Sequence, residues 1–164
     1  MRDEEFDAFA GAAWPRLRWT AYLLTGDRHL AEDLAQTALV RTYARWSRVR
    51  RGEAHAYARR TLVNLNVDRL RRRRFREVDE SQLPHGATST VGVVDDADLV
   101  VRLLAGLTDQ ERRVLVLRHY CDLAERTVAD ELGISVGTVK STCSRALAKV
   151  RATHPDLLDE GLTR

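Results

Sequence analysis

Polar and basic side chains are spaced along residues 136–151 so that they would share one side of a helix. The segment carries four basic residues, Lys140, Arg145, Lys149 and Arg151, and no acid. A solvated helix face usually mixes both signs of charge, so this face is predicted to contact an anion. Its members would be Thr138, Ser141 and Arg145, with Thr142, Ser144 and Lys149 beside them.

The opposite side of the same segment is apolar. Its apolar residues recur at intervals of three or four, the spacing of a stripe that packs into a core. Gly133 and Ser135, which precede the segment, predict a left-handed turn and a helix N-cap. The stripe consists of Val136, Val139, Cys143, Ala146, Leu147 and Val150.

A shorter helix is predicted immediately before this turn. Asp122 would cap it, and Val128, Ala129 and Leu132 would face inward, with Leu132 at its end. A helix, a glycine-containing turn and a second helix form the helix-turn-helix arrangement, whose second helix enters the major groove of DNA. An ordinary helical hairpin in a bundle is the alternative, and the single sign of charge on the polar face disfavours it.

The rest of the chain also has helical periodicity, without the alternation of a strand. Residues 4–24 predict a first helix that is interrupted or restarted near Pro15. Gly26 and Asp27 predict the end of that helix and the cap of the next one. A third helical stretch follows at residues 53–74. Further on, the sequence Thr108-Asp109-Gln110-Glu111 matches a capping box that starts a helix ending near Tyr120.

Charge is distributed unevenly along the chain. Residues 41–76 hold thirteen arginines against two acids, Glu53 and Asp68. Residues 77–98 hold six acids and no lysine or arginine, and their middle is rich in turn formers, which predicts a flexible linker of about 25 Å mean end-to-end length. We therefore expect an all-α protein with two small helical domains joined by a flexible acidic linker. The expected parts are residues 1–76, the linker 77–98, residues 99–152 and a tail at 153–164.

Composition argues against several classes of protein. The chain has 164 residues, of which 44% are hydrophobic, enough for a packed core. No stretch approaches about 20 uncharged apolar residues, and the acidic start MRDEEF is unlike a signal peptide, so a cytoplasmic protein without membrane insertion is expected. Cys121 and Cys143 occupy helical core positions and predict inert buried thiols. No pattern points to a catalytic residue, a metal or a cofactor, and we expect none.

Longer stretches resemble a known family. Residues 25–46, TGDRHLAEDLAQTALVRTYARW, and residues 56–74, AYARRTLVNLNVDRLRRRR, resemble regions 2.1 to 2.4 of the extracytoplasmic-function (ECF) sigma factors of bacterial RNA polymerase. Residues 104–151 are similar to their region 4. The resemblance covers most of the chain in the right order, without the region 1.1 and region 3 domains of larger sigma factors. Within the family, the chain is similar to the SigE-like actinobacterial group.

The resemblance implies two main partners, promoter DNA and core RNA polymerase with its β′ clamp helices and β flap. It also suggests an anti-sigma factor. The surface for the β′ clamp would carry Glu32, Asp33, Gln36 and Thr37. Acids early in a helix also stabilise the helix dipole, which is the alternative role for Glu32 and Asp33.

In the family, the segment that follows opens the minus-ten promoter element. Asn64 falls where family members form a short loop that captures a base flipped from the non-template strand, and an amide both donates and accepts toward a base edge. Trp46 and Tyr57 are candidates for base stacking, although their helical core spacing favours burial. A solvated helix end is the alternative for the arginine run. The arginines suited to DNA phosphates are Arg59, Arg60, Arg69, Arg71, Arg72, Arg73 and Arg74.

Region 4 of the family reads the minus-thirty-five element. Arg145 points away from the apolar stripe and is suited to a bidentate contact with guanine, whereas Lys140 at the flank suits a phosphate. Arg118 would be an outlying phosphate contact. The DNA-binding residues expected in this part are Arg118, Thr138, Lys140, Ser141, Ser144, Arg145 and Lys149.

Promoter-directed transcription initiation is the leading interpretation, with binding energy rather than catalytic residues driving strand opening. The alternative is a stand-alone helix-turn-helix repressor that uses residues 99–151 only. An enzyme is disfavoured because the sequence has no phosphate loop, metal cluster or nucleophile-base pair.

Overall fold

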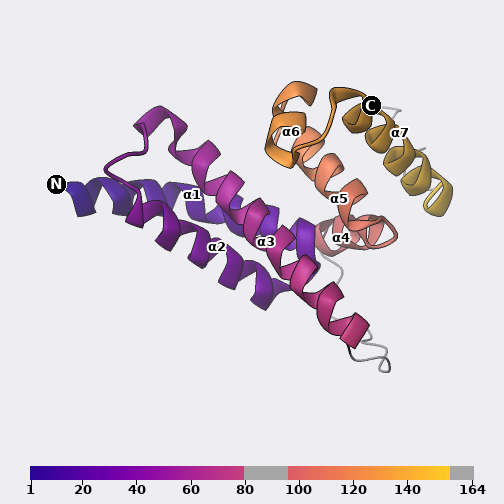
Figure 1. The fold of residues 1–164 in the computed structure, drawn as a ribbon, viewed down its shortest axis with the longest axis horizontal. Coiled ribbons are helices and arrows are strands. Elements are labelled where there is room, and N and C mark those ends of the chain that lie inside the picture. Colours follow the sequence, from indigo (N-terminus) through magenta and orange to yellow (C-terminus); the bar gives the residue numbers. More distant parts are fainter. Residues whose placement is uncertain (80–95, 156–164) are drawn as a thin grey trace. The chain divides into compact units, whose positions relative to one another are not determined.

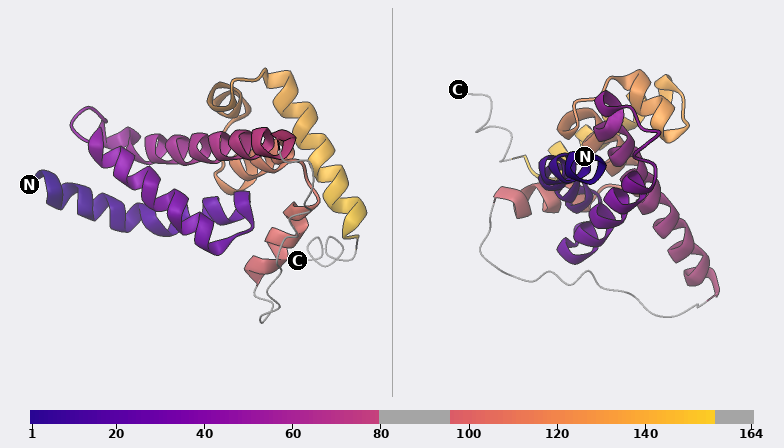
Figure 2. Two further views of the ribbon diagram at one scale, coloured as in Figure 1. Left: turned by 60° about the horizontal axis from the view of Figure 1, so that its bottom comes forward. Right: turned by 90° about the vertical axis from the view of Figure 1, so that its left-hand side faces the viewer.

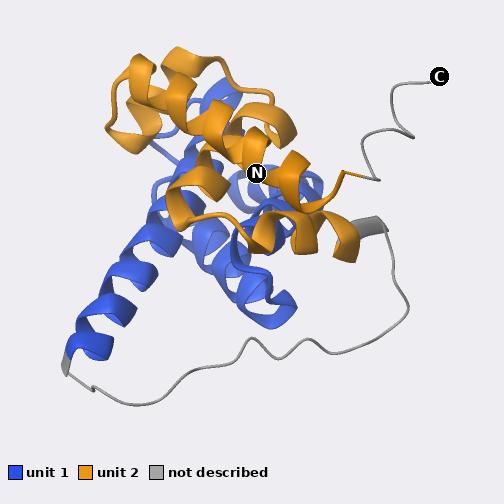
Figure 3. Cartoon of the chain, turned by 90° about the vertical axis from the view of Figure 1, so that its right-hand side faces the viewer, with its two compact units in different colours: residues 1–94 blue, residues 95–164 orange. Residues whose placement is uncertain are grey.

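The computed structural model describes residues 1–79 and 96–155 of the chain. These residues are largely helical and contain no strand, as their periodicity predicts. The chain divides into two compact units, Met1–Val94 (unit 1) and Asp95–Arg164 (unit 2), which Figure 3 colours separately. The all-α class and the two helical domains are confirmed. Residues 80–95 of the expected acidic linker lie outside the described residues, so its flexibility and the domain limits stay predictions.

Three helices pack side by side in unit 1: α1 (Arg2–Thr25), α2 (Arg28–Ala44) and α3 (Ala54–Asp79) (Figures 1 and 2). The C-terminal part of α3 extends past the ends of the other two, and residues 71–78 are all exposed there. Alanine is abundant in the centre of the bundle, because small side chains let helix backbones approach closely. The fully buried alanines are Ala13, Ala21, Ala31, Ala35, Ala38, Ala54 and Ala58.

Helix α1 runs unbroken through Pro15, so the interruption expected there is wrong. A proline inside a helix removes one hydrogen-bond donor and crowds the preceding turn, at a cost of about 3 kcal/mol. Pro15 lies on the exposed side of α1, while Ala13 and Leu17 are buried in the bundle. Packing of this inner face along the whole helix outweighs the local cost.

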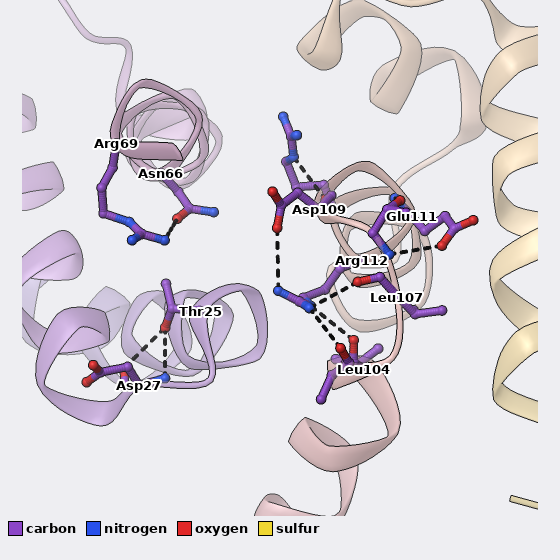
Figure 4. Close-up of polar contacts among 12 residues, drawn as sticks. Thr25, Asp27, Asn66, Arg69, Leu104, Leu107, Asp109, Glu111 and Arg112 are labelled. Carbon is purple, nitrogen blue, oxygen red and sulfur yellow. Dashed lines mark hydrogen bonds and ion pairs between the residues drawn. The ribbon is translucent and has the colours of Figure 1, made fainter. Parts of the chain in front are cut away.

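The turn between α1 and α2 is formed as predicted. Gly26 has a left-handed φ of 69°, which costs glycine little, and its N–H donates to the Tyr22 carbonyl at 2.8 Å. Asp27 is the N-cap of α2, and its carboxylate accepts from the Leu30 N–H at 3.0 Å. The Asp27 N–H in turn donates to Thr25 Oγ1 at 3.2 Å (Figure 4). These local contacts reverse the chain between the two helices.

The described part of unit 2 contains the helices α4 (Asp96–Ala105), α5 (Asp109–Leu115), α6 (Glu125–Leu132) and α7 (Val136–Thr153) (Figure 1). The predicted capping box is present: Thr108 Oγ1 accepts from the Glu111 N–H at 3.2 Å, and the Glu111 carboxylate accepts from the Thr108 N–H at 3.0 Å. Arg112 donates to the carbonyls of Leu104 and Leu107, both at 3.1 Å (Figure 4). The end of α4 is thereby fixed to the start of α5.

The segment after α5 differs from the prediction. The helical segment reaches Tyr120 as expected, but after Leu115 it is one wide π turn, η2 (Val116–Tyr120), in which the Cys121 N–H donates to the Val116 carbonyl at 3.0 Å. Asp122 then adopts a left-handed φ of 54°, which aspartate tolerates better than most residues. The N-cap of α6 is Ala124, without a side-chain bond, so the cap expected at Asp122 is wrong.

The turn between α6 and α7 matches the prediction. Gly133 has a left-handed φ of 65°, and the Ile134 N–H donates to the Ala129 carbonyl at 3.1 Å. Ser135 caps α7 by accepting from the Thr138 N–H at 3.1 Å. Val128 of α6 and Val139 of α7 are fully buried. Helices α6 and α7 therefore form the expected helix-turn-helix.

Candidate nucleic-acid interface

Helix α7 presents most of its predicted polar face to solvent. Lys140, Ser141, Ser144 and Arg145 are exposed, and Thr138 is half-buried beside the cap. Thr142 departs from the prediction, because it is buried at 1% exposure and its hydroxyl accepts from Arg145 Nη2 at 3.3 Å. A threonine side chain is small enough to join the core while its hydroxyl stays hydrogen-bonded. The polar face is therefore narrower than the sequence suggests.

The apolar stripe of α7 packs inward as predicted, with Val139 and Ala146 fully buried and the other members half-buried. Cys143 lies 3.5 Å from His119 through Sγ and Nε2. Burial raises the pKa of the Cys143 thiol, which keeps it protonated at neutral pH. Its partial burial agrees with an unreactive thiol in the core.

Two cations of the α7 face contact acids of unit 2. Lys140 Nζ lies 3.7 Å from the Glu125 carboxylate of α6, at the edge of the face. Lys149 Nζ donates to Glu111 Oε2 at 2.8 Å, and Glu111 is 5% exposed. The hydrogen bond from Lys149, together with that from the Thr108 backbone, lowers the pKa of Glu111. The predicted DNA contact of Lys149 stays a prediction, while the structure gives its ammonium a bracing role between α5 and α7.

Arg118 is also used inside unit 2. Its guanidinium donates from Nη1 to the Leu123 carbonyl, across the left-handed turn at Asp122, and it is half-buried. This bond holds the chain between η2 and α6. A phosphate contact by Arg118 stays a prediction.

In unit 1, the two asparagines of VNLNVD have opposite environments. Asn64 is exposed, whereas Asn66 is buried and its Oδ1 accepts from Arg69 Nη2 at 3.3 Å (Figure 4). Both lie within the uninterrupted helix α3, so the short loop that the family resemblance implies at Asn64 is not formed there. Asn64 therefore keeps an amide available on a helix surface, and Asn66 holds Arg69 in place. The sequence pattern did not predict this role of Asn66.

The arginines predicted for phosphate contact fall into two groups. Arg59 and Arg69 are half-buried against the bundle. The second group is exposed, and within it Arg73 pairs with Glu77 at 2.9 Å. Its members are Arg60, Arg71, Arg72, Arg73 and Arg74. The end of α3 thus carries cationic groups around its circumference, beyond the core.

A hollow of about 240 Å³ lies where the segment between α2 and α3 meets α3. Arginines dominate its lining, and three of them, Arg45, Arg48 and Arg50, were not predicted as site residues. These three arginines lie close together in the short segment between α2 and α3, and this clustering is the sequence feature that points to them. The complete lining is Arg45, Arg48, Val49, Arg50, Glu53, Ala56, Tyr57 and Arg60.

Contacts with α1 hold the segment that lines this hollow. Arg51 lies between two anchors: its Nη2 pairs with Glu5 at 2.7 Å and its Nη1 donates to the Trp46 carbonyl at 3.0 Å. Its guanidinium also stacks 4.1 Å above the Trp46 ring. Trp46 is buried against Phe6 and Phe9 at 5.1 and 5.0 Å between ring centroids, as core spacing predicts. Tyr57 is half-buried and lines the hollow.

The surface predicted for polymerase contact lies on α2. Glu32, Asp33, Gln36 and Thr37 are all exposed, and Glu32 pairs with Arg18 of α1 at 3.4 Å. Val40, one turn further along, is 65% exposed and was not predicted to belong to this surface. The core of a protein interface is more apolar than its rim, so an exposed valine here suits a contact surface.

None of the described helices is long and apolar enough to cross a lipid bilayer.

Two family models match the chain. Sigma-70 region 2 matches residues 12–76, and sigma-70 region 4 matches residues 97–150. The RNA polymerase sigma-E factor of Streptomyces avermitilis is 40% identical over 150 residues, which cover 90% of this chain and 83% of that protein. The ECF RNA polymerase sigma factor SigL of Mycobacterium tuberculosis is 33% identical over 168 residues, which cover 97% and 90%.

A solved structure of similar fold is available for comparison. It is the sigma factor RpoE of Bartonella quintana, crystallised in complex with the anti-sigma factor NepR. The TM-score is 0.73, and the match covers 98% of this chain and 99% of that chain at 23% identity. At this identity, the likeness shows the fold alone.

Proposed function

Because the chain belongs to the ECF family of RNA polymerase sigma factors, we propose that the residues described above divide promoter recognition between its two units. The protein binds core RNA polymerase and directs promoter-specific transcription initiation. Its region 2, in unit 1, opens the minus-ten element, and its region 4, in unit 2, reads the minus-thirty-five element. The match of residues 12–76 to region 2 leaves the stand-alone repressor without support.

The exposed face of α7 would read the minus-thirty-five element. Arg145 projects from the middle of the face, and its planar guanidinium suits the two acceptors of a guanine in the major groove. Ser141 and Ser144 flank it with short hydroxyl groups, and Lys140 lies at the edge, where a phosphate contact is expected. The fixed backbone of the helix-turn-helix supports this role, because base reading requires defined geometry.

Helix α3 and the hollow beside it would open the minus-ten element. A base that leaves the duplex loses stacking and pairing worth a few kcal/mol, so it needs a receiving pocket and anchored phosphates. The hollow, with Tyr57 and its arginines, is of a size and polarity to receive a base, and Asn64 lies two helical turns beyond Tyr57 on the same side of α3. The exposed arginines of α3 would hold the neighbouring phosphates. This concentration of positive charge around a hollow carries the proposal.

The exposed side of α2 would dock on the β′ clamp helices. Glu32, Asp33, Gln36 and Thr37 supply polar contacts, and Val40 adds an apolar one. Sigma factors are non-enzymatic transcription factors, and we infer that binding energy alone drives strand opening here. A cytoplasmic location follows from the two partners, polymerase and DNA.

An anti-sigma factor is a further proposed partner. The structural neighbour from Bartonella quintana was solved with such a protein. A regulator that covers the basic face of α3 or of α7 would prevent promoter binding without altering the fold.

Transcription in vitro with purified core polymerase tests the proposal. The wild-type protein is expected to give promoter-specific transcripts and a permanganate-reactive bubble at the minus-ten element. Asn64→Ala is expected to spare binding to the closed duplex and to lower opening about tenfold, because the amide's hydrogen bonds to an unpaired base of the opened strand are lost. Equal loss of duplex binding and opening would assign Asn64 to DNA binding in general. No binding of the wild-type protein to core polymerase would contradict the proposed function itself.

A further inference from the structure

One side of α3 connects the hollow to the far end of the helix. Tyr57, Arg60, Asn64, Arg71 and Phe75 follow one another at spacings of three, four or seven residues, so they share one face, here called the α3 face. All except Tyr57 are exposed. The buried residues of α3, Ala58, Leu62 and Asn66, lie on the opposite side. The α3 face is therefore a continuous surface that begins at the hollow and ends at Phe75.

Phe75 has an unusual position for a large apolar side chain. It is 71% exposed on the part of α3 that extends beyond the bundle (Figures 1 and 2). Burial of a phenylalanine stabilises a protein, and nothing in the described part of unit 1 supplies that burial. A single exposed apolar residue is common on protein surfaces, so exposure alone does not indicate a partner.

The surroundings of Phe75 are more specific than its exposure. Arg74 and Arg76 are its neighbours in sequence, and Arg71 precedes it by one turn on the same face. An aromatic ring among arginines is the arrangement by which proteins hold a single strand: the cations bind phosphates, and the ring stacks on a base. Charge complementarity thus favours nucleic acid over an apolar protein surface as the partner of this helix end.

We propose that Phe75 stacks on an unpaired base of the non-template strand at the end of the α3 face. The inference rests on the proposed function, since it requires that the strand opened near Asn64 continues along α3. The helix rise places Phe75 about 16 Å beyond Asn64, and a stacked strand advances about 3.4 Å per nucleotide. The stacked base is therefore roughly five nucleotides from the base that Asn64 contacts.

Asp68 provides an internal check on this path. It is an exposed acid on the α3 face, between Asn64 and Arg71. If the strand passes over it, the carboxylate repels the nearest phosphates, and Asp68→Asn strengthens binding of the opened strand about two- to threefold. An unchanged affinity would show that the strand leaves the α3 face before Phe75, and would overturn the inference.

The stacking itself is tested in the reconstituted holoenzyme. 2-Aminopurine is placed at single positions along the non-template strand of a fork-junction promoter, because stacking quenches its fluorescence. Phe75→Ala is expected to abolish quenching at one position and to weaken fork-junction binding about 5- to 100-fold. Phe75→Tyr should resemble wild type, whereas Phe75→Leu, which keeps the apolar volume, should resemble Phe75→Ala.

Val78→Ala is the matched control, because Val78 is 84% exposed one turn away and has no ring to stack. It should change binding less than twofold. Loss of affinity for core polymerase in Phe75→Ala, with fork-junction binding intact, would assign the residue to a protein contact and overturn the inference. Normal promoter opening with no effect of Phe75→Ala would also overturn it, while leaving the proposed function standing. A wild-type protein that opens no promoter would overturn both.

Discussion

The two basic helices of the protein, α3 and α7, present their polar faces in opposite ways. On α7, side chains of the face make contacts inside unit 2: Arg145 with Thr142, Lys140 with Glu125, and Lys149 with Glu111. On α3, the cations cluster where the helix leaves its bundle, and residues 71–78 are all exposed. The contacts on α7 fix the orientations of its side chains, whereas the exposed arginines of α3 adjust to the shape of a partner. Base recognition requires fixed side-chain orientations, whereas phosphate binding requires only positive charge nearby.

Substitution of Glu111 should have the largest effect on the contacts that hold α7 in place. Glu111→Ala removes the carboxylate half of the α5 capping box and the buried end of the ion pair to Lys149, and we expect the free energy of unfolding of unit 2 to fall by about 2–3 kcal/mol. Urea unfolding of the full chain, followed by circular dichroism, measures it. Glu111→Gln is the matched control, because glutamine keeps the cap and loses the charge, and it should cost about half as much. An equal loss of stability in the two variants would show that the side-chain cap at position 111 contributes nothing to the stability of unit 2.

Lowering the pH should weaken the ion pair between Glu111 and Lys149. The pKa of Glu111 is lowered in the folded chain, from an ordinary value of 4.5, first by the hydrogen bond from Lys149. A carboxylate of this kind adds stability above its unfolded pKa, and that stability is lost as pH falls through the lower, folded pKa. The wild-type protein should therefore lose more stability below about pH 5 than Glu111→Gln does. Parallel pH profiles would contradict this role.

Arg145 tests whether α7 reads bases. Arg145→Ala should lower discrimination between the correct minus-thirty-five element and a mutated one about 10- to 30-fold, because a bidentate guanine contact is lost. Affinity for core polymerase should not change, since Arg145 lies on the exposed face of α7 that is proposed to contact DNA. Arg145→Lys keeps the charge without the planar fork and should lose most of the discrimination as well. Competition binding of holoenzyme to the two promoters gives the ratio.

Arg72 tests the contrasting behaviour of α3. Arg72→Gln should weaken holoenzyme binding about fivefold on every promoter, because a phosphate contact carries no sequence information. The slope of log affinity against log salt should decrease by about 0.9. A loss confined to one promoter sequence would show that α3 reads bases at this point, and the distinction between the two helices would fail.

Substitution of Glu125 should have the smallest effect on DNA affinity. Its carboxylate lies 3.7 Å from Lys140 in an exposed pair, which contributes little to stability. Glu125→Gln removes an acid from the edge of the DNA-facing surface and should raise duplex affinity about twofold at low salt, with no change at high salt. Reduced affinity would mean that Glu125 positions Lys140 for its phosphate.

Local sequence predicted the features that depend on contacts within a few residues. The turn at Gly26, the cap at Asp27, the capping box of Thr108 and Glu111, and the cap at Ser135 are all present as expected. Each is a bond between a side chain or backbone group and a neighbour two to four residues away. The family resemblance extended these elements to promoter recognition, and the matches to regions 2 and 4 confirm that function.

Features that depend on packing were mispredicted or missed. Pro15 does not interrupt α1, Asp122 caps no helix, and Asn64 lies on a helix rather than in a loop. At Pro15 and Asp122, neighbouring elements impose a backbone that local preference alone would not choose. At Asn64, the periodicity of residues 53–74 already predicts a helix, and only the family resemblance implied a loop. The hollow beside α3 is also absent from any sequence pattern, since its lining comes from the segment after α2 and from α3 together.

The sequence by itself determined the helices, their turns, the uneven charge and the family, because periodicity, caps and composition act along the chain. Tertiary structure decided which partners those charged side chains have within the fold. Lys149 and Arg118 are basic residues like Lys140 and Arg145, and folding gives them the Glu111 carboxylate and the Leu123 carbonyl as partners. Those partners lie 38 and five residues away. Only folding brings Lys149 to Glu111, because these residues are far apart in the sequence, and the contact gives the ammonium a structural role inside unit 2.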